Sequence, residues 1–349
     1  MSTPMPTTCT DSVKPRVGLT APWVFLLLLV WISAGCAPTP AAQPATVDDV
    51  RAHALAWLHS QELDTGGFPD SQGQISPNST STVLALLATL PADEISEFRI
   101  QDALTALQST LIDWLGAKDS GPLARAVSGV TAAGGDPRHT AGQDLVADLW
   151  ANYDPQTGLF HPESLFRHLL AIQALSAAGE TIPAAAQTAI SHLQQPDGSW
   201  SWRITASTQP TLSNTSTPST EPPTPPTTGD VDTTAQTLRT LAALGITADD
   251  SRVQAALTYL AQTQSAQGGW AMDADTPPNA DSTGLVLTAL GELGLADQPD
   301  PAIRAAQAQT WLATLQQPDG SFHYSADLPG AIFLATLDSL PAFQWQFKP

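Results

Sequence analysis

The chain has 349 residues, of which 42 % are apolar, so it is long enough to bury a large core in one or two domains. Its formal net charge is −20, and only 13 residues are lysine or arginine. Nucleic-acid backbones are bound by clustered positive charge, so this composition argues against a nucleic-acid partner. The two cysteines, Cys9 and Cys36, lie near the start, so the rest of the sequence offers no disulfide and no thiolate metal ligand.

The N-terminal segment has the pattern of an export signal. Lys14 and Arg16 precede an apolar run over 21–32, and residues 33–36 read Ser-Ala-Gly-Cys. This order resembles the lipobox of bacterial lipoproteins, in which the cysteine becomes the acylated first residue, although serine replaces the usual leucine. The alternative is a plain transmembrane anchor, but the run is shorter than the ~20 apolar residues that span a bilayer.

The lipobox resemblance implies a signal peptide over 1–36, with Cys36 as the lipidation site. A tether rich in proline and alanine follows over 37–46. We therefore expect the protein to be exported and held at the outer face of the cell membrane, which it contacts through the lipid anchor.

Beyond the tether, apolar residues recur at helical spacing in twelve segments. Six outer helices are expected at 47–61, 99–115, 141–151, 184–195, 250–264 and 301–316. Six inner helices are expected at 80–90, 122–133, 163–178, 232–244, 282–293 and 329–340. The inner segments carry little charge, as expected of helices packed between partners and a lumen. We predict an all-α fold, an α6/α6 toroid over 47–349.

One stretch, 205–229, interrupts the fourth repeat and consists almost entirely of threonine, serine and proline. Such a composition cannot bury enough apolar surface to order itself. We expect a disordered insertion at one rim of the toroid. The alternative is a cover over the mouth of the lumen.

A short phrase, Gln-x-x-x-Gly-x-aromatic, recurs where outer segments end. Glutamine near a helix C-terminus can bond free carbonyls, glycine can turn the chain in a left-handed conformation, and the aromatic can pack over the join. These roles stabilise a fold and say little about chemistry. The copies are Gln194/Gly198/Trp200, Gln264/Gly268/Trp270, Gln316/Gly320/Phe322 and a shifted one at Gln61/Gly66/Phe68.

The phrase resembles the QW motif of terpenoid cyclases and protein prenyltransferase β-subunits, whose shared domain is an α6/α6 toroid. The resemblance covers roughly 47–340. Prenyltransferases hold catalytic zinc with Asp, Cys and His, and the toroid here has no cysteine, so that activity is nearly excluded. Cobalamin carriers use a toroid of this type without catalysis, which adds a corrinoid to the possible ligands.

A second resemblance concerns residues 230–235, which read Asp-Val-Asp-Thr-Thr-Ala. They are similar to the D-x-D-D-T-A acid motif of class II terpene cyclases, whose middle aspartate protonates an alkene or epoxide. The resemblance implies that Asp232 is the acid and Asp230 its flanking partner. Thr233 replaces the third aspartate, which weakens the support for a strong acid.

Capping is the competing interpretation of the same residues. Thr80, Asp232 and Asp281 occupy one position in three repeats, each at an expected helix start, and Thr233 with Gln236 has the spacing of a capping box. A feature shared by three repeats favours caps over catalysis in one repeat. The third possibility is contact with a ligand at the lumen rim.

Two further patterns contain possible metal ligands. His161, Glu163 and His168 lie close in sequence, and four oxygen ligands crowd the loop 273–281 without the spacing of an EF-hand. Both patterns favour ordinary structural roles, so we expect no metal and no cofactor.

These observations predict a lipid-anchored toroid that binds a small or extended apolar ligand, lipidic or corrinoid, without catalysis. The predicted ligand contacts are Thr80, Phe166, Phe333 and Asp281. One alternative is a class II terpene cyclase-like enzyme, although an aromatic-lined cavity would be needed and the inner helices offer mainly two phenylalanines. The other alternative is a structural surface protein.

Overall fold

The computed structural model describes residues 46–210, 228–298, 300–330 and 332–348. Cys36 and the expected signal lie outside these residues, as does the middle of the 205–229 insertion. The described residues form helices and isolated bridges, with no extended strand among them. No helix in this part of the chain is long and apolar enough to cross a membrane.

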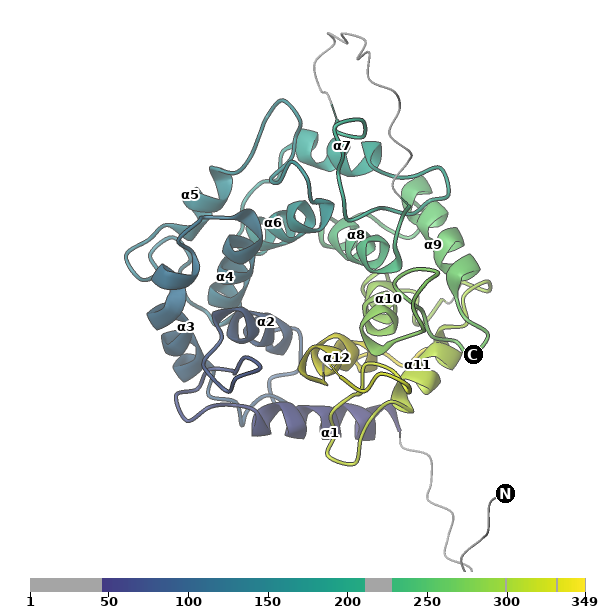
Figure 1. The fold of residues 1–349 in the computed structure, drawn as a ribbon, viewed down its shortest axis with the longest axis horizontal. Coiled ribbons are helices and arrows are strands. Elements are labelled where there is room, and N and C mark those ends of the chain that lie inside the picture. The colour runs from purple at the N-terminus through teal and green to yellow at the C-terminus, as the bar shows by residue number, and fades with distance from the viewer. Residues whose placement is uncertain (1–45, 211–227, 299, 331, 349) are drawn as a thin grey trace, which may run out of the picture. The chain divides into compact units, whose positions relative to one another are not determined.

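Among the described residues, six helices form the inner ring of the fold (Figure 1). They are α2 (Pro77–Leu87), α4 (Ser120–Ala132), α6 (Leu165–Ala177), α8 (Val231–Ala243), α10 (Ala280–Glu292) and α12 (Ile332–Ser339). Along the series from α2 to α12, each inner helix packs against the next. The ring encloses the lumen that the charge-poor segments predict.

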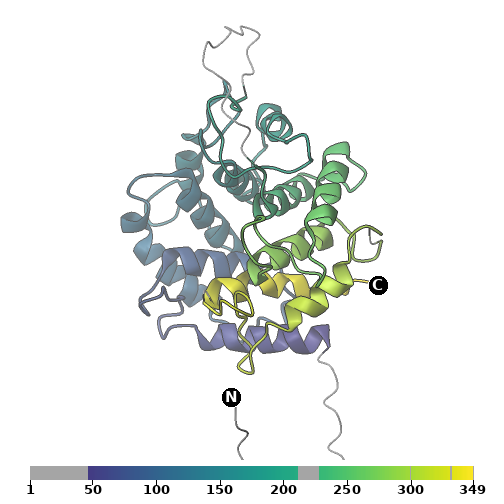
Figure 2. The same ribbon diagram turned by 45° about the vertical axis from the view of Figure 1, so that its right-hand side comes forward.

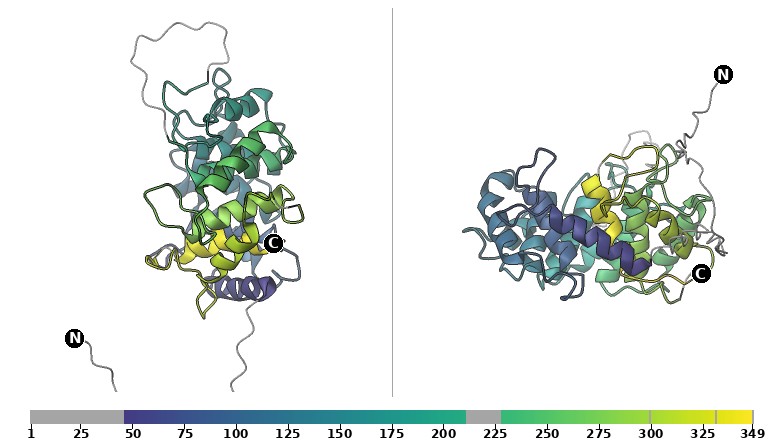
Figure 3. Two further views of the ribbon diagram at one scale, coloured as in Figure 1. Left: turned by 90° about the vertical axis from the view of Figure 1, so that its right-hand side faces the viewer. Right: turned by 90° about the horizontal axis from the view of Figure 1, so that it is seen from below.

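Six outer helices surround this ring, and the views in Figures 2 and 3 show the two layers from the side. They are α1 (Val47–Ser60), α3 (Ile100–Trp114), α5 (Leu145–Trp150), α7 (Ala184–His192), α9 (Ser251–Thr263) and α11 (Ala305–Ala313). A short 3-10 helix, η1 (Leu340–Phe343), follows α12 and packs against α1. The predicted α6/α6 toroid is therefore confirmed.

The helices α2, α4 and α10 begin two or three residues earlier than the sequence predicts, α8 begins one residue earlier, and α6 begins two residues later. At α2, α8 and α10 the N-caps differ from those expected. Ser76, Asp230 and Asn279 cap α2, α8 and α10, each accepting a hydrogen bond from the backbone N–H three residues on. Their backbones are extended, as an N-cap requires. The expected capping by Thr80, Asp232 and Asp281 is wrong.

Thr80 has another structural role. Its hydroxyl accepts a hydrogen bond of 2.9 Å from the N–H of Phe68, the aromatic of the first repeat phrase, and its side chain is fully buried away from the lumen. The expected ligand contact at Thr80 is therefore also wrong. The same bond is made by Thr234 to Trp200, Thr283 to Trp270, Thr336 to Phe322 and His168 to Phe160.

Three copies of the repeat phrase join an outer helix to the next one around the ring. The Gln264 amide donates to the carbonyl of Gly268 at 2.7 Å and to that of Arg304, at the start of α11, at 3.2 Å. Gln194 makes the equivalent pair of bonds. Glycine in each phrase has a positive φ, and the indole N–H of Trp270 donates back to the outer helix it follows. The stabilising roles that the sequence predicts are those seen.

The last phrase closes the ring onto the first helix. The Gln316 amide donates to the carbonyl of Val50 in α1 at 2.8 Å. Arg51, also in α1, donates to the carbonyl of Phe343 in η1 at 2.8 Å. These bonds connect residues from opposite ends of the described chain.

The described flanks of the insertion are ordered, which departs from the expected disorder over all of 205–229. Residues 205–208 form a turn in which the Thr205 N–H donates to the Thr208 hydroxyl at 2.9 Å. Ile204, just before it, is buried.

Candidate functional site

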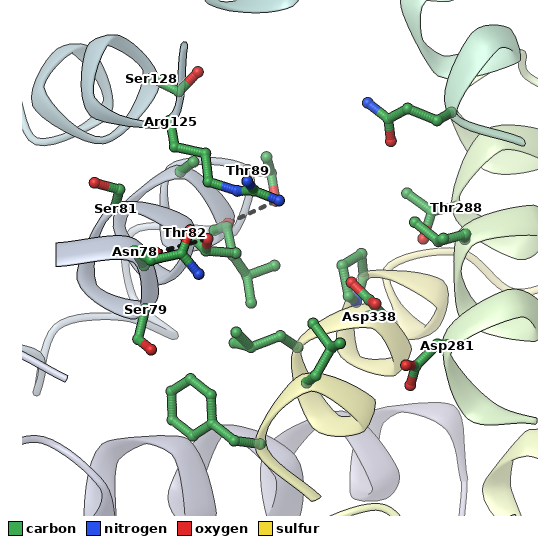
Figure 4. Close-up of a pocket in the computed structure, with 18 of the residues that line it drawn as sticks. Asn78, Ser79, Ser81, Thr82, Thr89, Arg125, Ser128, Asp281, Thr288 and Asp338 are labelled. Atoms are coloured by element: carbon green, nitrogen blue, oxygen red, sulfur yellow. Dashed lines mark hydrogen bonds between the residues drawn. The ribbon is translucent and has the colours of Figure 1, made fainter. Parts of the chain in front are cut away.

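The lumen contains a cavity of about 1330 Å³. Side chains from all six inner helices reach it, together with residues from α1 and from the segment after η1. Much of its wall is apolar, formed by Trp57, Leu86, Phe166, Leu170, Leu285, Phe333, Leu334, Leu337 and Trp345. This lumen is the candidate functional site (Figure 4).

Four aromatic side chains line the cavity. Phe166 and Phe333 are the two predicted ligand contacts among them. The sequence predicts lining aromatics only on the inner helices, whereas Trp57 lies on α1 and Trp345 follows η1. The rings of Trp57 and Phe333 lie 6.0 Å apart between centroids. The lumen therefore offers more aromatic surface than the sequence analysis expected.

Lining residues fall into layers because the inner helices repeat one register. In α2, α6, α8 and α10, the side chain of the fourth residue accepts a hydrogen bond from the backbone N–H of the aromatic residue in its repeat. These four helices therefore have a common register along the axis of the ring. Phe166, Asp232 and Asp281 are second residues of their helices and form one layer. The sixth residues form another, about 6 Å further along the axis at 1.5 Å per residue.

Asp232 and Asp281 face this cavity from neighbouring helices. Each has a buried Oδ1 without a hydrogen-bond partner among the described residues. Burial raises the pKa of Asp232 to about 6, to which the charge of Asp230 adds. Burial, with the nearby Asp232, raises the pKa of Asp281 to about 7. Both groups can therefore carry a proton near neutral pH.

Asp338, on α12, is a third lumen carboxyl and was not predicted. Burial raises its pKa well above the ordinary value, and the charges of Asp281 and Asp232 act in the same direction. Figure 4 shows Asp338 and Asp281 on one side of the lumen, facing the polar side chains of α2 and α4. Asp338 is the only charged residue in α12, a signal that could have identified it.

Asp230 does not line the cavity. Its carboxylate accepts from the N–H of Thr233 at 2.7 Å and from that of Trp202 at 3.0 Å. It is therefore the N-cap of α8 rather than a second acid in the lumen. The expected capping box is also wrong, because Gln236 instead donates to Gln173 at 2.7 Å.

We expect Asp230→Ala to lower the unfolding free energy by about 0.5–2 kcal/mol, because α8 loses its N-cap acceptor. Asp230→Asn should recover most of this loss, since an amide oxygen can accept the same bond. Asp232→Ala removes no cap and should cost less. Urea denaturation of the three variants measures the difference, and an equal loss in both alanine variants would contradict the assignment.

Two arginines also line the cavity. Arg239, on α8, pairs with Glu292 through bonds of 2.9 and 3.2 Å. Arg125, on α4, has no hydrogen bond or ion pair to another described residue, and Figure 4 shows it extending into the lumen. The two guanidinium groups thus differ in their partners.

The possible metal ligands of the sequence do not converge. His168 is buried and accepts from the Phe160 N–H, and burial lowers its pKa to about 4. Asn279 caps α10, and Asp281 faces the lumen. Among the described residues, no group of three or more His, Cys, Asp or Glu side chains is arranged to hold a metal ion.

Two family models match parts of the chain. The squalene-hopene cyclase C-terminal domain matches residues 221–328, and the prenyltransferase alpha-alpha toroid domain matches residues 24–118. No curated protein matches the chain.

Several solved structures share the fold. The type II terpene cyclase MstE from Scytonema is 17% identical, with a TM-score of 0.57 over 85% of this chain and 96% of its own. A protein from Actinoplanes is 14% identical, with a TM-score of 0.55 over 86% and 99%. The unsaturated glucuronyl hydrolase from Bacillus sp. GL1 is 12% identical, with a TM-score of 0.52 over 85% and 95%. The chain is therefore an α/α toroid of the kind shared by squalene-hopene cyclases and prenyltransferases.

Proposed function

We propose that the lumen binds an elongated, largely apolar molecule. The observation that carries this proposal is the cavity of about 1330 Å³ with its apolar and aromatic wall. Ordinary small-molecule pockets measure roughly 300–1,000 Å³ and are lined mainly by apolar side chains, with a few polar groups for orientation. The lumen exceeds that range and has such groups on α8, α10 and α12.

The neighbouring structures suggest a chemical class for a first probe. MstE has been solved with geranylgeranyl dihydroxybenzoate as substrate and with merosterolic acid A as product. At 17% identity this likeness concerns the fold, so it guides the choice of a C20 prenyl chain and does not fix the ligand.

Acid catalysis by Asp232 is a second candidate function, and one observation favours it. Asp232 is not a cap, and its carboxyl faces the lumen with burial raising its pKa to about 6. A carboxyl that keeps a proton near neutral pH can act as a general acid. In this chain Thr233 replaces the third aspartate of the D-x-D-D-T-A motif. Asp281, from the next inner helix, supplies a second carboxyl near Asp232 instead.

Equilibrium dialysis of the purified protein with geranylgeranyl dihydroxybenzoate and with geranylgeraniol tests the proposal. We expect saturable binding of at least one of them. Leu285→Trp fills the lumen and should weaken binding at least tenfold, whereas Ile112→Trp, at an exposed position outside the lumen, should leave it unchanged. Binding that is absent, or that is insensitive to Leu285→Trp, would contradict the proposal and favour a structural surface protein.

Analysis of the same incubations by mass spectrometry separates binding from catalysis. A cyclised product that disappears in Asp232→Asn, with binding retained, supports the acid role because the amide cannot donate that proton. Unchanged probe in all samples leaves binding alone as the function.

We also propose that Cys36 tethers the toroid to the outer face of the cell membrane. The support is the sequence order of basic flank, apolar run and Ser-Ala-Gly-Cys. An amphiphilic ligand would be abundant at such a surface, which agrees with the proposed lumen function.

A further inference from the structure

Arg125 is a cation in the lumen that has no counter-ion among the described residues. It is the sixth residue of α4, and its guanidinium extends from that helix toward the open space between α2 and α10 (Figure 4). Neither a hydrogen bond nor an ion pair joins it to another described residue. The other lining arginine, Arg239, is matched by Glu292 at 2.9 Å.

An unpaired guanidinium in a cavity lowers the stability of the fold unless an anion or hydrogen-bond acceptors compensate for its loss of water. An arginine stays protonated in proteins and presents five N–H donors in a fixed fork. Taking an unpaired charge out of water is unfavourable, and burial does lower the pKa of Arg125. The charge and the donors of Arg125 are therefore available to a ligand in the cavity.

The nearest candidate counter-ion inside the protein is Asp338. Asp338 lines the same cavity from α12, and the charges of Asp338 and Arg125 each shift the pKa of the other group. Asp338 and Arg125 do not form an ion pair in the described structure, because no oxygen of Asp338 lies within 4 Å of a nitrogen of the guanidinium. Burial also raises the pKa of Asp338 well above its ordinary value, which favours the uncharged acid.

Apolar side chains line the same cavity as Arg125 and can hold an apolar body attached to a polar end. Leu170 and Leu285 reach the cavity from α6 and α10. Phe166 lies one helical turn from Leu170 on α6, about 6 Å along the helix axis. A terminal anion held by Arg125 would leave the attached chain in contact with these apolar side chains.

We propose that the lumen ligand ends in an anionic group, a carboxylate or a phosphate monoester, that pairs with Arg125. This inference rests on the proposed function and adds the polarity of the ligand to it. Guanidinium groups bind both anions through two parallel N–H···O bonds.

The carboxyl groups on the opposite helices repel an anionic ligand less than three ionised carboxylates would. Asp232, Asp281 and Asp338 are the acids that face the cavity from α8, α10 and α12, and burial raises the pKa of each. A protonated carboxyl donates a hydrogen bond to an anion instead of repelling it. Glu292, the remaining acid near Arg239, is already paired.

A ligand series with one C20 chain and different ends tests the proposal. The probes are geranylgeraniol, geranylgeranoic acid, geranylgeranyl monophosphate and geranylgeranylamine, bound to the purified full chain at pH 6.0. We expect at least one anion to bind about 10- to 100-fold tighter than the alcohol, as hydrogen bonds to charged groups allow. Whichever of the two anions binds more tightly identifies the class of headgroup.

Variants at Arg125 show whether that preference comes from this residue. Arg125→Met should abolish it and leave the alcohol affinity within about threefold, since the methionine keeps most of the apolar stem. Arg125→Lys, which keeps the charge but loses the fork, should retain part of it. The control is the double variant Arg138→Gln/Glu180→Gln, which removes an ion pair outside the lumen without a change in net charge and should keep the preference.

The outcomes separate the two proposals. Equal binding of alcohol and anions, or an anion preference that survives Arg125→Met, overturns the role of Arg125 and leaves the apolar lumen site intact. Tightest binding of the amine overturns it in favour of recognition of a cation by the carboxyls. Binding of none of the four probes contradicts the proposed function itself.

Discussion

Gly320→Ala is expected to lower the unfolding free energy by about 2–5 kcal/mol. Gly320 has φ of +95°, and a Cβ there would collide with the backbone carbonyl of His53 in α1. The left-handed conformation costs an alanine about 1–2 kcal/mol, and overpacking adds about 1–3 kcal/mol. The clash lies at the contact that closes the ring, so the chain cannot relieve it without opening the toroid.

Gly73→Ala provides the matched control for this prediction. Gly73 also has a positive φ, +76°, but nothing lies within 4 Å of an added Cβ. It should show only the conformational cost, about 1–2 kcal/mol. Urea and thermal denaturation of both variants measure the difference, and equal losses would mean that the contact between Gly320 and α1 is not a rigid part of the fold.

The second large effect is a gain in stability. Asp281→Asn is expected to stabilise the protein above pH 7 by about 2–4 kcal/mol and to have little effect near pH 4. Burial raises the pKa of Asp281 to about 7, against 3.8 for an ordinary aspartate. As the pH rises from 4 to 7 the unfolded chain loses this proton before the folded chain does, so stability falls. An asparagine has no proton to lose and avoids that penalty.

Asp250→Asn should instead lower the stability of the protein. The Arg252 guanidinium bonds the Asp250 carboxylate and lowers its pKa to about 2, so this group stabilises the fold above pH 4 and loses that contribution as the pH falls toward 2. Melting temperatures of the wild type and both variants between pH 4 and pH 8 test the pair. A loss of stability in Asp281→Asn at pH 8 would show that Asp281 is held ionised by a favourable partner.

The sequence predicts the helices well because the fold repeats one local pattern. Apolar spacing and the Gln-x-x-x-Gly-x-aromatic phrase occur in several copies, so errors in one repeat are corrected by the others. The predicted boundaries are less accurate at the starts of the inner helices. At α8, for example, Asp230 and Asp232 are both acceptable N-cap residues. Only the backbone distinguishes them, since Asp230 is extended at φ −131° and ψ 155° while Asp232 is already helical.

The candidate site was predicted only in part, for a related reason. Phe166, Phe333 and Asp281 do line the lumen, because the inner helices were identified correctly. Arg125 and Asp338 were missed, since periodicity places a residue on a helix face and not at a height in a ring. Each is the only charged residue of its inner helix, and a lone charge in an otherwise uncharged inner segment is the signal that marks them.

The bond from Gln316 to Val50 has a consequence for how the protein folds during synthesis. It joins residues separated by 266 positions, so α1 lacks its last neighbour until the C-terminal repeat has been made. At roughly 5–20 residues per second the ribosome needs roughly 15 to 50 s for that interval. In a linear solenoid each new repeat immediately covers the one before it. Here the last neighbour of α1 comes from the C-terminal repeat, so we expect the apolar face of α1 to stay uncovered until the whole chain is available to close the ring.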